Sequence, residues 1–142
     1  MDHLKEEERS WNMRRIKSKN TKPEIIFRKL IHRVGYRYRL HDKKLPGKPD
    51  LVLKKFKTAI FIHGCFWHQH EKCLKAATPK SNIDYWGKKL VKNLERDADN
   101  IRRLKYGGWH VFIVWECELK NPERIFKRFE SFIDAAKDGR SV

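Results

Sequence analysis

The sequence predicts an α/β fold in which a mixed β-sheet carries helices on its faces. Helical apolar stripes and short runs of β-branched or aromatic residues follow one another in the order α-β-β-β-α-β-α, which is typical of such a sandwich. The 142 residues fit one domain with one core, and a hydrophobic content of 39% is enough to fill it. We therefore expect a single domain over residues 21–142, preceded by an N-terminal arm over residues 1–20.

The first helix of this domain is expected to begin at Thr21. Thr21 and Glu24 form a capping box ahead of an apolar helical stripe, and Gly35 ends the helix. The alternating residues Tyr36–Leu40 then predict a strand with one basic face, and His41–Lys48 predicts a turn-rich loop.

Three apolar runs predict the buried strands of the sheet. Leu51–Leu53 and Thr58–Ile62 are joined by a short basic turn and predict a hairpin, while Trp109–Trp115 predicts a separate strand. The segment Cys65–Lys80 lacks core periodicity and is expected to be irregular.

Two longer helices complete the predicted fold. Ser81 and Asn82 can cap the first, and Gly107 stops it; Asn121 begins the second, which is expected to fray from Asp134 onward. The inward stripes of the two helices are expected to be Leu90, Leu94, Ala98, Ile101 and Leu104, and then Ile125, Phe126, Phe129, Phe132 and Ile133.

The net charge of +16 points to a polyanionic partner. Nucleic acid is the expected partner and a membrane surface is the alternative. No stretch is apolar enough to span a bilayer, and Met1–Arg9 lacks the apolar run of a signal peptide, so we expect an intracellular, cytoplasmic protein. The basic second half of Met1–Asn20 is either a solvated tail or an arm laid along phosphates.

Four residues have the side chains of a tetrahedral zinc site. Cys65, His70 and Cys73 lie within nine residues, and Cys117 follows the last strand. Thiolate and imidazole ligands suit a structural Zn²⁺ ion, which would stabilise an irregular loop. The spacing is not that of a standard zinc finger, so free thiols at these cysteines remain the alternative.

A carboxylate at the start of the hairpin is the candidate ligand of a catalytic metal. Asp50 opens a strand, and a carboxylate held there can bind Mg²⁺, with a carbonyl near Ile62 as a second oxygen ligand. The alternative is that Asp50 caps a local N–H group. The capping box already explains Glu24. Asp97 is explained by pairing with a neighbouring Lys or Arg on the polar face of its helix.

Two histidines flank the first cysteine. A neutral imidazole can accept a proton from water near neutral pH, so either His63 or His68 could be a general base while the other contacts a phosphate. Both could instead be surplus zinc ligands or surface residues, and the sequence does not divide the roles.

Three aromatic residues could contact nucleic acid. Phe66 and Trp67 lie in the loop rich in metal-ligand residues, and large flat side chains on a basic protein can wedge between base pairs. Trp86 lies on the apolar stripe of the long helix, where core packing is expected unless that end of the helix projects beyond the core.

Several segments resemble the very-short-patch-repair (Vsr) DNA mismatch endonucleases. The resemblance covers nearly the whole chain, and the run His63–His68 is its most specific part. The matching segments are Asn12–Arg14, Leu45–Asp50, Phe61–His68, Lys92–Asp97, Gly108–Val111 and Ile113–Cys117.

The resemblance implies a restriction-endonuclease-like core and a Mg²⁺-dependent nick 5′ to the thymine of a T:G mismatch in double-stranded DNA. It also implies a monomer in the bacterial cytoplasm, associated with the nucleoid, with mismatch-repair proteins as candidate partners.

The resemblance assigns a role to each candidate residue. Asp50 and the Ile62 carbonyl would bind Mg²⁺, and His68 would be the general base, held or assisted by Glu24. Asp97 would support the metal-bound water network, and His63 would contact the scissile phosphate region. The remaining assignments are structural zinc at Cys65, His70, Cys73 and Cys117, intercalation by Phe66, Trp67 and Trp86, and an arm with Met13 and Arg14 that clasps the duplex.

Two other functions are compatible with the same residues. A restriction-type nuclease of this fold would cut both strands at a fixed sequence. A non-catalytic, zinc-stabilised DNA-binding module would explain the charge and the cysteines but would leave Asp50 and His68 without a role.

Overall fold

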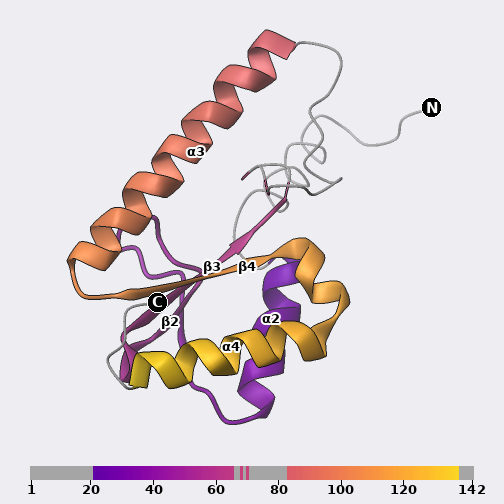
Figure 1. Cartoon of the computed structure of the whole chain (residues 1–142), viewed down its shortest axis with the longest axis vertical. Coiled ribbons are helices and arrows are strands. Elements are labelled where there is room, and N and C mark those ends of the chain that lie inside the picture. The colour runs from indigo at the N-terminus through magenta and orange to yellow at the C-terminus, as the bar shows by residue number, and fades with distance from the viewer. Residues whose placement is uncertain (1–20, 66–67, 69, 71–82, 138–142) are drawn as a thin grey trace, which may run out of the picture.

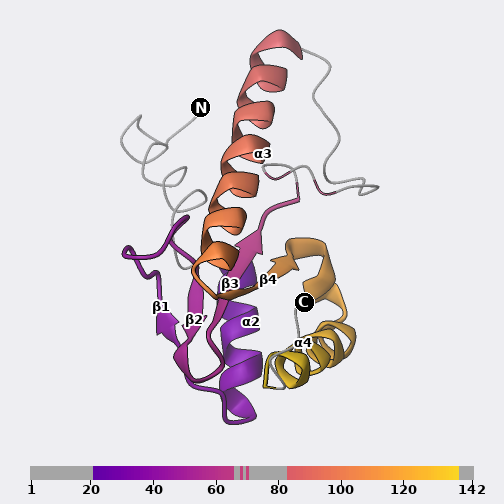
Figure 2. The same ribbon diagram turned by 60° about the vertical axis from the view of Figure 1, so that its left-hand side comes forward.

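The computed structural model describes residues 21–65, 68, 70 and 83–137. Its centre is a four-stranded sheet in the order β1-β2-β3-β4 (Figures 1 and 2). The first three strands are antiparallel, and β3 pairs with β4 in parallel. The strands are β1 Arg39–Leu40, β2 Leu51–Leu53, β3 Thr58–His63 and β4 His110–Trp115. The predicted mixed sheet, hairpin and order of elements are therefore confirmed.

Three long helices cover the sheet: α2 Lys22–Arg33, α3 Ile83–Tyr106 and α4 Pro122–Lys137. Alternate residues of the strands point to opposite faces. Ile60 joins α2 and α4 in the larger core cluster, whereas Ala59 and Phe61 contact Leu104 near the end of α3. Helices α2 and α4 thus share one face, and the last turns of α3 cover the other (Figure 2).

Helix α2 begins after Thr21, the N-cap residue that the sequence predicts. Thr21 Oγ1 accepts a hydrogen bond from the Glu24 amide at 3.4 Å, and Phe27 and Ile31 are fully buried on the inner face. Gly35 follows the helix at a φ of +106°, a backbone conformation that glycine adopts without steric cost.

The strand predicted over Tyr36–Leu40 is shorter than expected and pairs only at Arg39–Leu40. The two tyrosines are held back toward α2 and the core. The Tyr36 amide donates to the Ile31 carbonyl at 3.1 Å, and the Tyr38 hydroxyl donates to the Arg28 carbonyl at 3.3 Å. These contacts outcompete the alternation that predicted a longer strand.

The inward stripe predicted for α3 is wrong in its middle. Leu90 and Leu104 are buried, but Ala98 is exposed and 43% of the Leu94 surface is accessible. The reason is visible in Figures 1 and 2: the N-terminal half of α3 extends past the sheet, so none of the described strands lies beneath that stretch. Trp86 lies on this projecting half and is partly exposed.

Helix α4 begins as predicted, with the Asn121 side chain accepting from the Arg124 amide at 3.3 Å. The fraying expected from Asp134 is not seen as far as Lys137, because Ala136 is still packed inward at 9% exposure. All five residues predicted to point inward lie in or against the larger core cluster: Ile125, Phe126, Phe129, Phe132 and Ile133.

Candidate active site and metal centres

The candidate site forms where β2 begins and β3 ends. The hairpin register pairs Leu51 with Ile60, so the residue before β2 lies beside the last residues of β3. The Asp50 Oδ2 atom accepts a hydrogen bond from the Ile62 amide at 2.7 Å. Because the N–H and C=O of one strand residue point to the same side, the Ile62 carbonyl also points toward Asp50. The structure thus brings together the two groups predicted to bind Mg²⁺.

A buried carboxylate and a histidine complete this corner of the site. Glu24 is 1% exposed, and the His41 Nε2 atom lies 3.0 and 2.9 Å from its two oxygens. Arg28 contacts the same carboxylate at 3.0 Å. Glu24, His41 and Asp50 each offer a ligand atom, and these three atoms lie within 4.8 Å of one another.

Sequence reasoning missed His41, which it placed in a loop without a role. The signal lies in the strand register. Leu40 pairs with Leu51, and continuing the ladder by one residue sets His41 opposite Asp50, where the His41 amide donates to the Asp50 carbonyl at 3.0 Å. If the sequence analysis had paired Leu40 with Leu51, it would have predicted that His41 lies next to Asp50.

Burial raises the pKa of Asp50 from 3.8 to about 6. The Ile62 amide lowers this pKa, the Glu24 carboxylate raises it, and the charges of His41 and His68 lower it. Two neighbouring carboxylates in a buried place create a negative site that favours a cation, and their hard oxygen atoms are ligands that Mg²⁺ prefers. The residues of this corner therefore fit the predicted magnesium ion.

A second group of side chains orients His68 so that its ring can accept a proton. The His68 Nδ1 atom contacts the Asp97 Oδ2 atom of α3 directly. An ionised carboxylate only accepts hydrogen bonds, so the proton of a neutral His68 lies on Nδ1 and the lone pair lies on Nε2. Asp97, rather than the expected Glu24, is the carboxylate that contacts His68, while Glu24 contacts His41 and Arg28.

His63 is stacked on this histidine. The two imidazole centroids are 3.7 Å apart and their planes differ by 5°. His63 is 5% exposed, and its Nδ1 atom has no hydrogen-bond partner among the described residues. Burial and the neighbouring His68 charge lower the pKa of His63 to about 3, against a smaller opposite effect of Asp97. His63 is therefore a neutral side chain at physiological pH.

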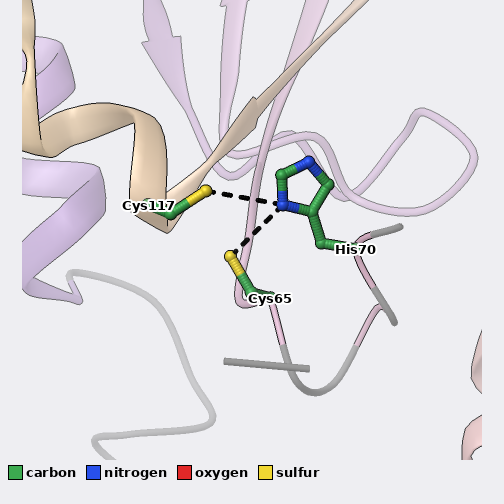
Figure 3. A group of neighbouring side chains, drawn as sticks. All are labelled: Cys65, His70 and Cys117. Atoms are coloured by element: carbon green, nitrogen blue, oxygen red, sulfur yellow. Dashed lines mark hydrogen bonds between the residues drawn. The ribbon is translucent and has the colours of Figure 1, made fainter. Parts of the chain in front are cut away.

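A third group has soft ligand atoms. Figure 3 shows Cys65 and Cys117 pointing toward the His70 Nδ1 atom, from 3.7 and 3.4 Å respectively. Cys65 is fully buried just after β3, and Cys117 lies in the short helix η3 Glu116–Lys120 that follows β4. Two sulfur atoms and one imidazole nitrogen this close together suit a tetrahedral Zn²⁺ ion and leave one position for a fourth ligand.

The loop around this third group is tied to the end of β4. The Glu116 carboxylate accepts from the Cys65 amide at 3.0 Å, and the His70 amide donates to the Cys65 carbonyl at 2.9 Å. The parallel pairing of β3 with β4 places Cys117, which follows β4, beside the loop that follows β3.

Several predicted residues lie outside the part of the chain that the structure describes. These are the fourth zinc ligand Cys73, the intercalating Phe66 and Trp67, and the arm residues Met13 and Arg14. Trp86 is described, and the Lys89 ammonium group lies 5.8 Å from its ring centroid. Among the described helices, none is both long and apolar enough to cross a membrane.

Known proteins are similar to this chain over most of its length. The type II nicking enzyme V.NmeAIP of Neisseria meningitidis is 49% identical and covers 92% of both chains. The type II nicking enzyme V.XorIIP of Xanthomonas oryzae is 43% identical over 94% of this chain and 97% of its own. The DNA mismatch endonuclease Vsr of Escherichia coli is 42% identical over 82% of this chain and 74% of its own.

A sequence model of one family, described as DNA mismatch endonuclease Vsr, matches residues 1–75. This match includes the hairpin, Asp50 and the stacked histidines, and the similarity to the Escherichia coli enzyme extends the relationship beyond them. The chain belongs to the Vsr family of DNA mismatch endonucleases.

Proposed function

We propose that the chain is a Mg²⁺-dependent endonuclease that nicks one strand of duplex DNA 5′ to the thymine of a T:G mismatch. One observation carries the proposal: a buried carboxylate next to the Ile62 backbone and a histidine oriented by Asp97 meet at one end of the sheet. The charge of His68 is one of the groups that lower the pKa of Asp50, which supports a site shared by the two residues.

Each residue of the site has a defined role in this reaction. Bound Mg²⁺ would polarise the scissile phosphate and stabilise the leaving oxygen. The Asp50 carboxylate and the Ile62 carbonyl would hold the ion. The His68 Nε2 atom takes a proton from the attacking water, and the Asp97 carboxylate stabilises the imidazolium that forms. His63 contacts the phosphate region and keeps the His68 ring in its plane.

The Glu24 carboxylate adds negative charge beside Asp50 and is itself held by His41 and Arg28. We assign it to water molecules around the metal ion rather than to His68. This differs from the role that the family resemblance implied, because the carboxylate in contact with the His68 ring is that of Asp97.

The zinc-ligand group supports the loop that carries these histidines. Cys65, His70 and Cys117 would hold a structural Zn²⁺ ion together with Cys73, and the ion would contribute to folding because the sequence of this loop lacks core periodicity. His68 lies between the two ligands Cys65 and His70 in the chain, so the same ion would restrict its backbone.

DNA binding is assigned to the charge of the chain, and mismatch preference to the aromatic residues. A net charge of +16 supports tight but sequence-independent binding to the phosphates. Phe66, Trp67 and Trp86 would wedge beside the mismatch, where unstacking costs less than at a matched step. The projecting half of α3 supports a wedge role for Trp86, and Met13 and Arg14 would clasp the duplex.

The names of the relatives support the nicking reaction from two sides. The Escherichia coli relative is named a mismatch endonuclease, and the Neisseria and Xanthomonas relatives are named nicking enzymes. A nick at an asymmetric mismatch needs no two-fold symmetry, so we propose that the enzyme acts as a monomer on the bacterial nucleoid, in the cytoplasm.

A nicking assay tests the proposal. Purified protein is given a labelled duplex with one T:G mismatch, or the matched T:A duplex, in several flanking sequences, with Mg²⁺ or with EDTA. We expect a Mg²⁺-dependent nick on the thymine strand of the mismatched duplex alone, and no nick by Asp50→Ala or His68→Ala protein that still binds DNA. Cleavage of both strands of matched DNA would favour a restriction-type nuclease, and binding without cleavage would favour a DNA-binding module.

A further inference from the structure

We propose that Trp115 is a positioning residue that aligns the His63–His68 pair with the zinc-ligand group, so that the geometry of the base depends on that group. The inference rests on the proposed function for the role of His68. It adds a residue to which neither the sequence nor the family resemblance assigned any role, and it connects two sites that have been treated as separate.

The rings of four residues form a continuous series. The His70 and Trp115 rings are stacked, with centroids 4.2 Å apart and planes 10° apart. Trp115 meets His63 at 5.2 Å in an edge-to-face arrangement of 74°, and His63 stacks on His68. The series therefore begins at a candidate zinc ligand and ends at the histidine that contacts Asp97.

The plane of His63 depends on these ring contacts. Its Nδ1 atom is buried and has no hydrogen-bond partner within the described parts of the chain, so no such bond fixes that side of the imidazole. Among the described residues, the rings in contact with it are those of Phe61, His68 and Trp115. Since His68 lies flat on His63, a rotation of His63 would be passed on to the base.

Trp115 itself is anchored from both directions. It is the last residue of β4 and pairs with His63 in the parallel ladder. Its amide donates to Glu118 Oε1 at 3.0 Å, and Arg128 holds the Glu118 carboxylate at 2.8 and 3.0 Å. Arg128 also donates to the Ile113 carbonyl at 2.6 Å. A residue with so fixed a backbone can hold two other rings in place.

A core-filling role does not account for this residue. Trp115 is only partly buried and belongs to neither of the two hydrophobic clusters that stabilise the sheet. Trp109, which precedes the same strand, does pack against the cluster on the α3 side. Trp109 is therefore a matched control for the loss of a tryptophan from this strand without the loss of the ring series.

The experiment compares Trp115→Ala, Trp115→Phe and Trp109→Phe with the wild-type protein, all purified with zinc. The quantities are the single-turnover nicking rate at saturating Mg²⁺, the DNA affinity in EDTA, the zinc content, and the ring NMR signals of selectively labelled histidines. We expect Trp115→Ala to lower the rate by about tenfold to a hundredfold, as misplacement of a base does, with unchanged DNA affinity. Trp115→Phe, which keeps a flat ring, should recover most of the rate, and Trp109→Phe should leave it unchanged.

The NMR measurement does not require catalysis, so it separates this inference from the proposed function. Removing zinc with a chelator should shift the His63 ring signals in wild-type and Trp115→Phe protein, and much less in Trp115→Ala protein that is folded by circular dichroism. The inference is overturned if Trp115→Ala nicks at the wild-type rate, or if its His63 signals respond to zinc as strongly as those of the wild type. If the wild-type protein does not nick at all, the proposed function fails and the zinc response alone decides the inference.

Discussion

Asp50→Asn should stabilise the metal-free protein while abolishing the nick. The carboxyl group of Asp50 has its pKa raised from 3.8 to about 6, first by burial and further by the neighbouring Glu24 carboxylate. The difference is about 2 units, and each unit corresponds to about 1.4 kcal/mol, so ionised Asp50 destabilises the folded state by about 3 kcal/mol at neutral pH. Asparagine has no charge to bury and can still accept the hydrogen bond from the Ile62 amide.

The pH dependence of this effect has a definite sign. A group with a raised folded-state pKa binds its proton more tightly when folded, so its penalty is absent below pH 4, develops between pH 4 and 6, and is constant above. The stability gained by Asp50→Asn should follow the same curve. Such a gain at a functional residue is the expected exchange of stability for activity.

Urea denaturation in EDTA at several pH values between 4 and 8 measures this gain. Asp99→Asn is the matched control, because Asp99 is a half-exposed carboxylate on α3 and pairs with Arg102 at 2.5 Å. Adding Mg²⁺ should narrow the difference by stabilising the wild type alone. A variant that is no more stable than wild type at pH 7, or a gain that persists unchanged at pH 4, would refute the reasoning.

Three further predictions follow from the other contacts of the site. Asp97→Asn should lower the single-turnover rate by about 10²- to 10⁴-fold without weakening DNA binding, because an amide can hold the imidazole in the wrong tautomer; an equal loss in Asp99→Asn would show that the charge of α3, rather than the contact with His68, is responsible. Cys117→Ala should reduce the bound zinc measured by atomic emission and lower the melting temperature in zinc-containing buffer, and a normal zinc content with an unchanged melting curve would argue against the zinc site. His41→Ala should weaken the Mg²⁺ affinity measured by calorimetry in catalytically inactive His68→Ala protein, because Glu24 loses the partner that holds it; His41→Gln should restore it, and equal affinity in all three proteins would remove His41 from the site.

Short-range sequence patterns were sufficient to predict features that depend on residues close together in the chain. The Thr21–Glu24 capping box predicted the start of α2, and the two apolar runs around the basic turn predicted the β2–β3 hairpin. In both cases the determining groups are only a few residues apart in the chain, so their interaction does not depend on the rest of the fold. The histidines and cysteine of the ligand-rich loop were recognisable for a related reason, since Cys65, His68 and His70 share one short stretch of the chain.

The partners of these residues came from elsewhere in the chain. Asp97 on α3 contacts His68, and His41 after β1 contacts Glu24 on α2, although the family resemblance implied that Glu24 assists His68. Such pairs depend on how a helix crosses a sheet and on how a ladder continues beyond its last strand residue. The exposure of Leu94 has the same origin, because helical periodicity marks an apolar face but does not tell how far the sheet beneath it extends.

The sequence by itself thus determined the class of fold, the net positive charge that indicates a polyanionic partner, and the types of side chain available for chemistry. Composition and short-range periodicity carry that information. Only the tertiary structure decided which carboxylate orients which histidine and that Trp115 lies between the two histidine-containing groups. The physical reason is that strand β4 pairs in parallel with β3 only after the long excursion through α3, so contacts across that pairing have no short-range signature in the chain.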